Sequence, residues 1–275
     1  MQSLLASGVN PVMVWDNSGD GGESGRSIAK AFQSDSRVLL KGRNSNLGFA
    51  AGVNAGLAKS RAQAPQAWVL LINNDAVFPL DLLPKMITAL EADVHAILAF
   101  PTVRQSGRLQ TWGHYQRWLG LIMRSPALGT FPYASGCCQL IATDRLNPPL
   151  YDEIFFMYGE DCELSWRLFR ARLKIIHVDG AHVEHEGSAS SGPNTAFYET
   201  QMVIGHLLLA VRISRGPIEA ALLLLLRVPT LCARALIRSV RYRHVRPLVC
   251  YVAGMREAFR VLKTAKRASV GRELP

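Results

Sequence analysis

The chain has 275 residues, of which 49% are hydrophobic, and a formal net charge of +10. This length suits one large domain, or one domain with an appendage, and the apolar content is ample for a substantial core. The five cysteines include no Cys-x-x-Cys pair, which argues against a disulfide scaffold or a structural zinc site and fits a reducing cytoplasm.

Apolar runs and helical periodicities alternate along the first 185 residues. We expect strands at 11–15, 37–41, 67–72, 94–100, 133–142, 173–178 and 182–185, and helices at 25–34, 49–61, 81–92 and 161–171. Strands that alternate with helices predict an α/β fold with a mostly parallel sheet flanked by helices. Residues 102–132 read as a long irregular loop, which could shape an acceptor site around Trp112.

After residue 194 the chain is expected to be helical to about residue 267, with interruptions at Gly216-Pro217 and Pro229. The Leu-rich run 220–226 is too short to span a membrane, and the N-terminus shows no signal peptide. Residues 206–275 hold 14 of the 31 Lys and Arg residues but only 3 of the 21 Asp and Glu residues. With no nucleic-acid motif present, this basic and apolar region is expected to bind an anionic membrane surface, or simply to pack on the core.

Two polar segments follow the first strands. Asp16 comes directly after the strand 11–15, where it either caps a turn or accepts hydrogen bonds from a base or ribose. The segment Asn46 to Gly56 is punctuated by Gly and Asn and leads into a helix. Backbone N–H groups at a helix N-terminus attract phosphate, although the glycines also suit close packing of the helix on the sheet.

The tripeptide Asn73-Asn74-Asp75 ends the apolar strand 67–72. Ligands of α/β folds bind at the edge where such strands end. Asp75 could therefore hold a divalent metal on a diphosphate, whereas the alternative is a polar turn.

Two further segments carry groups that could act chemically. Glu160, Asp161 and Glu163 lie at the start of a helix, where acidic residues stabilise the helix dipole or where one of them acts as a general base. His182 and His185 should lie on opposite faces of a strand, so that only one of them could complete a metal site with Asp75.

These segments, in this order, resemble family-2 inverting glycosyltransferases of the GT-A fold, most closely the bacterial rhamnosyltransferase-like branch. The resemblance runs from about Pro11 to Ser190. Its carriers are Val14-Trp15-Asp16-Asn17-Ser18-Gly19-Asp20-Gly21, Asn46-Leu47-Gly48-Phe49-Ala50-Ala51-Gly52-Val53-Asn54, Leu70-Leu71-Ile72-Asn73-Asn74-Asp75, Ser135-Gly136-Cys137, Phe156-Met157-Tyr158-Gly159-Glu160-Asp161-Cys162-Glu163-Leu164 and His185-Glu186-Gly187-Ser188.

The resemblance implies a role for each matched residue. Asp161 would be the catalytic base, while Asp75 and His185 would hold Mg²⁺ or Mn²⁺ on the diphosphate. Donor nucleotide and sugar contacts would come from Asp16, Asn46, Gly48, Asn54, Asn73, Asn74 and Gly136. Glu160 and Trp112 are candidates for the acceptor side.

One part of the family pattern has no counterpart. Relatives begin with a strand that ends in a Thr-Tyr-Asn-like motif, whereas Ser3 to Ser7 look like the end of the helix that would follow it. The sheet is therefore expected to lack an internal strand and the donor site one wall.

The sequence thus predicts a glycosyltransferase domain over residues 1–200 and a helical region over residues 201–275 that binds the membrane. The best candidate reaction moves L-rhamnose from dTDP-rhamnose to a cell-envelope glycan or lipid-linked acceptor, on the cytoplasmic face of the plasma membrane. The alternatives are a galactofuranosyl, glucosyl or N-acetylglucosaminyl donor, or a non-catalytic membrane-associated remnant. The oligomeric state does not follow from the sequence.

Overall fold

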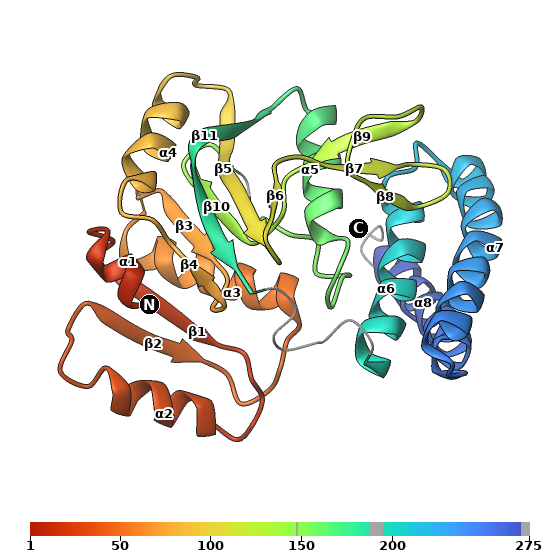
Figure 1. Cartoon of the computed structure of the whole chain (residues 1–275), viewed down its shortest axis with the longest axis horizontal. Helices are drawn as coiled ribbons and strands as arrows, with labels where there is room; N and C mark the ends of the chain where they lie inside the picture. The colour runs from red at the N-terminus through yellow and green to blue at the C-terminus, as the bar shows by residue number, and fades with distance from the viewer. Residues whose placement is uncertain (66, 147, 187–194, 271–275) are drawn as a thin grey trace. The chain divides into compact units, whose positions relative to one another are not determined.

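The computed structural model describes residues 1–65, 67–146, 148–186 and 195–270 (Figure 1). The chain forms two compact units. Unit 1 comprises residues 1–112, 134–151 and 167–187, and unit 2 comprises residues 113–133, 152–166 and 188–275. Each unit has its own hydrophobic core. The units interleave along the chain, and the expected domains 1–200 and 201–275 remain a sequence-based prediction. Gly187 and Ser188, which end the last matched motif, lie outside the described residues.

Unit 1 contains two sheets. β1 (Val12–Asp16) and β2 (Val38–Gly42) form a parallel pair. The second sheet has the strand order β3–β10–β5–β11–β4, with β6 paired to β5. Its strands are β3 (Val69–Ile72), β4 (Ala76–Val77), β5 (Ala96–Gln105), β6 (Arg108–Gln110), β10 (Cys138–Ile141) and β11 (Lys174–His185).

The sheets are mixed rather than mostly parallel as expected from the sequence. Among the described strands of unit 1, β1 with β2 and β5 with β11 pair in parallel, and the other pairs are antiparallel. The difference arises because β10, β4 and β6 enter the sheet from loops and turns rather than from crossover helices. The α/β class itself is confirmed.

No hydrogen-bonded strand joins the two sheets within the described part of the chain. β1 and β3 therefore each have one edge without a partner strand among the described residues. Residues Gln2–Ala6 form the short helix α1, where the sequence predicted the end of a helix.

The helices of unit 1 are α2 (Glu23–Ala31), α3 (Phe49–Gln63) and α4 (Leu82–Glu91). α4 buries Leu82, Met86 and Leu90, which are spaced four residues apart and pack in the same core as Ala96 and Ala99 of β5. β11 is one strand with an irregularity between Val178 and His182, where the sequence predicted two strands. α5 (Glu160–Arg170) contributes residues 160–166 to unit 2 and residues 167–170 to unit 1.

Unit 2 combines a small antiparallel sheet with three long helices. The sheet has the order β8–β7–β9, with β7 (Gly113–Gln116), β8 (Leu121–Met123) and β9 (Thr130–Tyr133). The expected irregular loop at 102–132 was therefore wrong, because it contains β6 to β9. The helices are α6 (Ala196–Arg212), α7 (Pro217–Tyr242) and α8 (Arg246–Val270).

α7 corrects two expectations. Pro229 lies inside the helix and does not interrupt it. Proline has no N–H group, so Pro229 cannot donate the usual helical hydrogen bond to the Leu225 carbonyl. Because Leu225 and Pro229 lie on the exposed side of α7, this carbonyl need not be buried. The run 220–226 belongs to a helix of 26 residues, which by length and composition alone could cross a membrane.

Candidate functional site

The end of β3 and the end of β11 meet in unit 1. The Asn73 amide donates to the Cys137 carbonyl, and a turn then leads into β4, whose Ala76 is in register with His185 of β11. This pairing places His185 Nε2 3.1 Å from Asp75 Oδ1 and 3.4 Å from Asn73 Nδ2. The side chains of Asp75 and His185 are each 13% exposed. The structure thus brings together three residues that the sequence singled out.

The Asp75–His185 pair fits a divalent cation. Asp75 offers carboxylate oxygens and His185 an imidazole nitrogen; both ligand types suit Mn²⁺, and the carboxylate also suits Mg²⁺. His182 lies within 2.9 Å of Glu184 instead, and of the two histidines it is His185 that contacts Asp75. Across the residues that the structure describes, no group of three or more His, Cys, Asp or Glu side chains could hold a metal. A cation at this pair would therefore need further ligands from a bound substrate. Asn74 is exposed beside the pair.

Asp16 lies at the end of β1, where its carboxylate accepts hydrogen bonds from the Ser18 amide and hydroxyl. A Cβ atom at Gly25 would lie 2.8 Å from Asp16 Oδ2, so a glycine leaves room for this carboxylate. Asp16 thus caps the turn after β1 and is also partly exposed, and its contact with a nucleotide stays a prediction.

Hydrogen bonds to Asn17 hold the loop before α3 in place. The sequence did not predict this role for Asn17. Asn17 donates to the Gly48 carbonyl and to Asn46 Oδ1, and it accepts from the Leu47 amide. Asn46 Oδ1 also accepts from the Gly48 amide. Gly48 has a φ of 82°, in the left-handed region that favours glycine. The sequence feature that could have identified Asn17 is its position directly after Asp16, the last residue of β1.

Asn54 and Gly136 have packing roles in unit 1. The Asn54 side chain donates to the Tyr151 carbonyl and accepts from the Tyr151 amide, so it positions that segment. A Cβ atom at Gly136 would lie 3.1 Å from the Tyr151 hydroxyl and 3.5 Å from Phe49, so a larger residue would require the Tyr151 hydroxyl to shift by a few tenths of an ångström. Donor contacts by these two residues remain predictions.

The acidic start of α5 lies in unit 2. Asp161 is partly exposed and accepts a hydrogen bond from the Cys162 amide at 2.8 Å. Glu160 is buried, and its Oε2 atom has no hydrogen-bond partner among the described residues. Burial and the neighbouring Asp161 raise the pKa of Glu160 to about 8. Glu160 is therefore a buried carboxyl group that is protonated at neutral pH, and its place on the acceptor side stays a prediction.

The raised pKa of Glu160 predicts a pH-dependent stability. The folded chain keeps a proton that the unfolded chain releases above its ordinary pKa of 4.5. The free energy of unfolding should thus fall between about pH 4.5 and 8, by at most roughly 1.4 kcal/mol per pH unit. Glu160→Gln should flatten this dependence in urea unfolding, whereas Glu23→Gln, which removes an exposed carboxylate, should not. An unchanged slope in Glu160→Gln would contradict the assignment.

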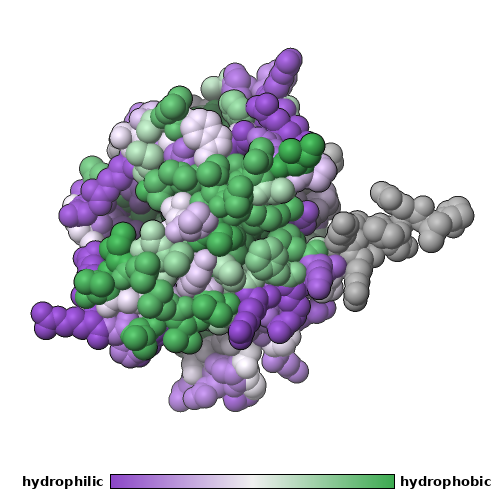
Figure 2. Space-filling view, turned by 90° about the vertical axis from the view of Figure 1, so that its right-hand side faces the viewer, coloured by the Kyte–Doolittle hydropathy of each residue, from purple (hydrophilic) through white to green (hydrophobic). Residues whose placement is uncertain are grey.

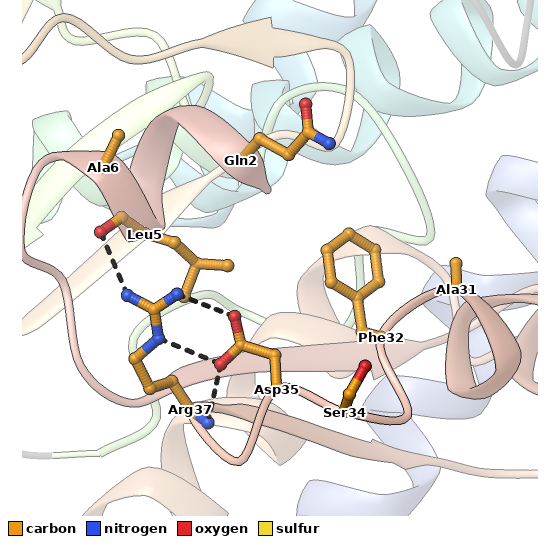
Figure 3. Close-up of a pocket in the computed structure, with 8 residues that line it drawn as sticks. All are labelled: Gln2, Leu5, Ala6, Ala31, Phe32, Ser34, Asp35 and Arg37. Carbon is orange, nitrogen blue, oxygen red and sulfur yellow. Dashed lines mark hydrogen bonds and ion pairs between the residues drawn. The ribbon is translucent and has the colours of Figure 1, made fainter.

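Trp112 is the last residue of the first segment of unit 1, and its ring lies edge-on to Phe100 at 4.7 Å between ring centroids. A cavity of about 440 Å³ lies elsewhere in unit 1, beside α1 and the start of β2 (Figure 3). Its charged groups satisfy each other, because Arg37 pairs with Asp35 at 2.7 Å and also donates to the Leu5 carbonyl. It contains none of the predicted site residues, and we assign it no ligand.

In a comparison with known protein families, residues 11–147 match the family described as glycosyl transferase family 2. The match covers about half of the chain and includes Asp16 and Asp75 but not Asp161 or His185. No curated protein matches the chain significantly.

A solved structure with a similar fold is described as "Crystal structure of GalNAc-T7 with UDP, GalNAc and Mn2+". Its TM-score is 0.54 at 13% sequence identity, and the alignment covers 71% of this chain and 41% of that one. This chain therefore spans less than half of the length of that protein. At this identity the likeness concerns the fold, and it agrees with the expected GT-A-like α/β architecture.

Proposed function

Because this chain carries a glycosyl transferase family 2 domain over residues 11–147, we propose that it transfers a sugar from a nucleotide-sugar donor to a cell-envelope glycan or lipid-linked acceptor. The observation that carries the proposal is the Asp75–His185 pair with Asn73 at the end of β3. Its position at a strand end suits binding of a diphosphate.

In this proposal, Asp75 and His185 hold Mg²⁺ or Mn²⁺. When bound, such a cation would neutralise charge on the leaving nucleoside diphosphate. The Mn²⁺ and UDP named for the similar structure support a metal and a nucleotide at this kind of fold. Asp16 and the Asn46–Gly48 loop, which Asn17 fastens, would contact the nucleotide.

Asp161 would act as the general base. It would take the proton of the acceptor hydroxyl while that oxygen bonds to the anomeric carbon. The bond from the anomeric carbon to the diphosphate breaks in the same displacement, which inverts the configuration. Asp161 is partly exposed at the start of α5, which suits a base that must meet an acceptor.

The donor that we propose is dTDP-L-rhamnose, on the strength of the resemblance to the rhamnosyltransferase-like branch. Release of nucleoside diphosphate from a donor panel tests this, with UDP-galactofuranose, UDP-glucose and UDP-N-acetylglucosamine beside dTDP-rhamnose. We expect metal-dependent release from dTDP-rhamnose. Preference for a UDP donor would replace the sugar but keep the reaction, and release from none of the four, with an acceptor lipid extract present, would contradict the proposal.

We further propose that the enzyme works as a peripheral protein on the cytoplasmic face of the plasma membrane. The basic, apolar region 201–275 supports this location, because a lipid-linked acceptor would be presented there.

A further inference from the structure

α7 has an uninterrupted apolar outer face. Its exposed positions recur at spacings of three and four residues along the helix, so they form one stripe. Ile218 and Val240, near the two ends, are each 79% exposed. The stripe, here called the α7 outer face, consists of Ile218, Leu222, Leu225, Leu226, Pro229, Ala233, Leu236, Ile237 and Val240. It contains no charged or hydrogen-bonding side chain and extends over about 33 Å at 1.5 Å per residue.

The opposite face of α7 is fixed in unit 2. Its buried residues are Leu223, Arg227, Leu231 and Ala235, again at a spacing of four. Arg227, near the middle of the helix, is fully buried and donates to the main-chain carbonyls of His206 and Arg117, both at 2.6 Å. Its guanidinium also lies 5.3 Å from the Tyr115 ring centroid. These bonds tie α7 to α6 and to the end of β7.

The two Arg227 hydrogen bonds argue against α7 as a transmembrane helix, although its length and composition would allow it to span a bilayer. To span a bilayer, the helix would leave α6 and β7 and lose both Arg227 bonds. The guanidinium would then lie near the middle of the hydrocarbon layer, where a charged side chain is costly. A helix that keeps these bonds can offer only its outer face to lipid.

The surroundings of the outer face are basic. Exposed arginines lie just before the helix at Arg215, in its last turn at Arg241 and after it at Arg243. No acidic side chain forms an ion pair with Arg241 or Arg243 among the described residues. Glu219, in the first turn, is paired with Arg117. Figure 2 shows the broad hydrophobic area on this side of the molecule, with hydrophilic residues around it.

The charges around the α7 outer face favour one kind of partner over the others. A second copy docked through the same face by a twofold axis would bring arginine-rich edges of like charge close together. Nucleic acid would leave the apolar stripe without a matching surface. Anionic lipid offers hydrocarbon for the stripe and negative headgroups for the arginines at its ends.

We infer that the α7 outer face is a membrane-docking surface that takes anionic lipid, with α7 lying in the plane of the membrane rather than across it. This inference rests on the membrane location in the proposed function and assigns it to particular residues. Arg227 is the residue that keeps the helix in the fold and thereby in this orientation.

The test is sedimentation of the full chain with vesicles of phosphatidylcholine alone and of phosphatidylcholine with phosphatidylglycerol. We expect binding to the anionic vesicles and release by an alkaline carbonate wash. Leu225→Asp and Leu236→Asp should each weaken binding roughly tenfold or more, since each removes one leucine from the lipid contact. Val94→Asp is the matched control, because Val94 is 72% exposed but lies in unit 1, and it should bind like the parent.

Each other outcome decides against the inference. Equal binding by all variants would show that the α7 outer face does not contact lipid. Equal binding to neutral and anionic vesicles would show that the arginines at its ends do not contribute. Resistance to the carbonate wash would indicate a spanning helix. Failure to bind vesicles, with a dimer that Leu225→Asp dissociates, would make a second copy the partner. Donor cleavage in solution, measured on the same preparations, reports on the proposed reaction separately and should be equal in all of them.

Discussion

Replacement of Asp161 by asparagine is expected to reduce turnover by roughly 10²- to 10⁴-fold, the usual contribution of a positioned general base. An asparagine can still accept the hydrogen bond that the Cys162 amide donates, so the start of α5 should keep its conformation. It cannot take a proton from the acceptor hydroxyl. Initial rates of transfer, together with the affinity for donor, measure the effect, and donor affinity should change little.

Glu23→Gln is the control for Asp161→Asn. Glu23 is an exposed carboxylate in the first turn of α2, so its loss removes a favourable interaction with a helix dipole but no chemistry. Its turnover should equal that of the parent. Full turnover in Asp161→Asn would exclude Asp161 as the base, and weakened donor binding in that variant would point to a structural role instead.

Asp75→Ala should remove the metal dependence of donor use. Asp75 supplies the one carboxylate of the pair with His185, so its loss leaves a single imidazole for the cation. We expect kcat/KM for the donor to fall by more than the roughly 10- to 100-fold that is typical when only an outer partner of a metal ligand is lost. A titration of rate against Mn²⁺ concentration, at fixed donor, measures it.

Asp81→Ala controls for the loss of an aspartate with a cationic partner. Asp81 is exposed and pairs with Lys85 at 2.6 Å, six residues after Asp75. Its donor kinetics should match the parent. His185→Ala should show the same loss of metal dependence as Asp75→Ala. A normal response to the metal in either variant would show that the replaced residue does not bind the cation.

Much of unit 1 was predictable from the sequence, because its signals are local. The apolar runs that became β1, β2 and β3 are bounded by Gly, Asn and Asp turns, and α4 shows a clear four-residue spacing. The antiparallel entry of β10 was missed, since strand direction depends on the route of the connecting loop and not on the strand's own residues. The short strands β7 and β8 were missed because three or four residues carry too little periodicity.

The helical region shows how tertiary contacts override local signals. Pro229 predicted a break, yet α7 continues because its inner face is held by Leu223, Arg227 and Leu231 on both sides of the proline. Nothing in the sequence indicated that Arg227, in a leucine-rich segment, would be buried and donate to main-chain carbonyls of α6 and of Arg117, just after β7.

The candidate site was predicted in part. The sequence singled out Asp75 and His185 as possible partners in one metal site, and the two side chains lie 3.1 Å apart in the structure. Asn17 was missed because its role depends on three partners thirty residues away in the chain. The burial of Glu160 was not foreseen, because burial of a carboxylate at the start of a helix depends on what packs over it.

Calorimetric titration of the full chain with dTDP and with UDP, each with and without Mn²⁺, tests the diphosphate site at Asp75 and His185 most directly. We expect nucleoside diphosphate to bind at least tenfold more tightly with the metal than without it. Mn²⁺ alone should bind weakly, because the pair offers few protein ligands. The metal effect should vanish in Asp75→Ala and persist in Asp81→Ala. Binding of both nucleotides that is indifferent to the metal, or that Asp75→Ala leaves unchanged, would contradict the site.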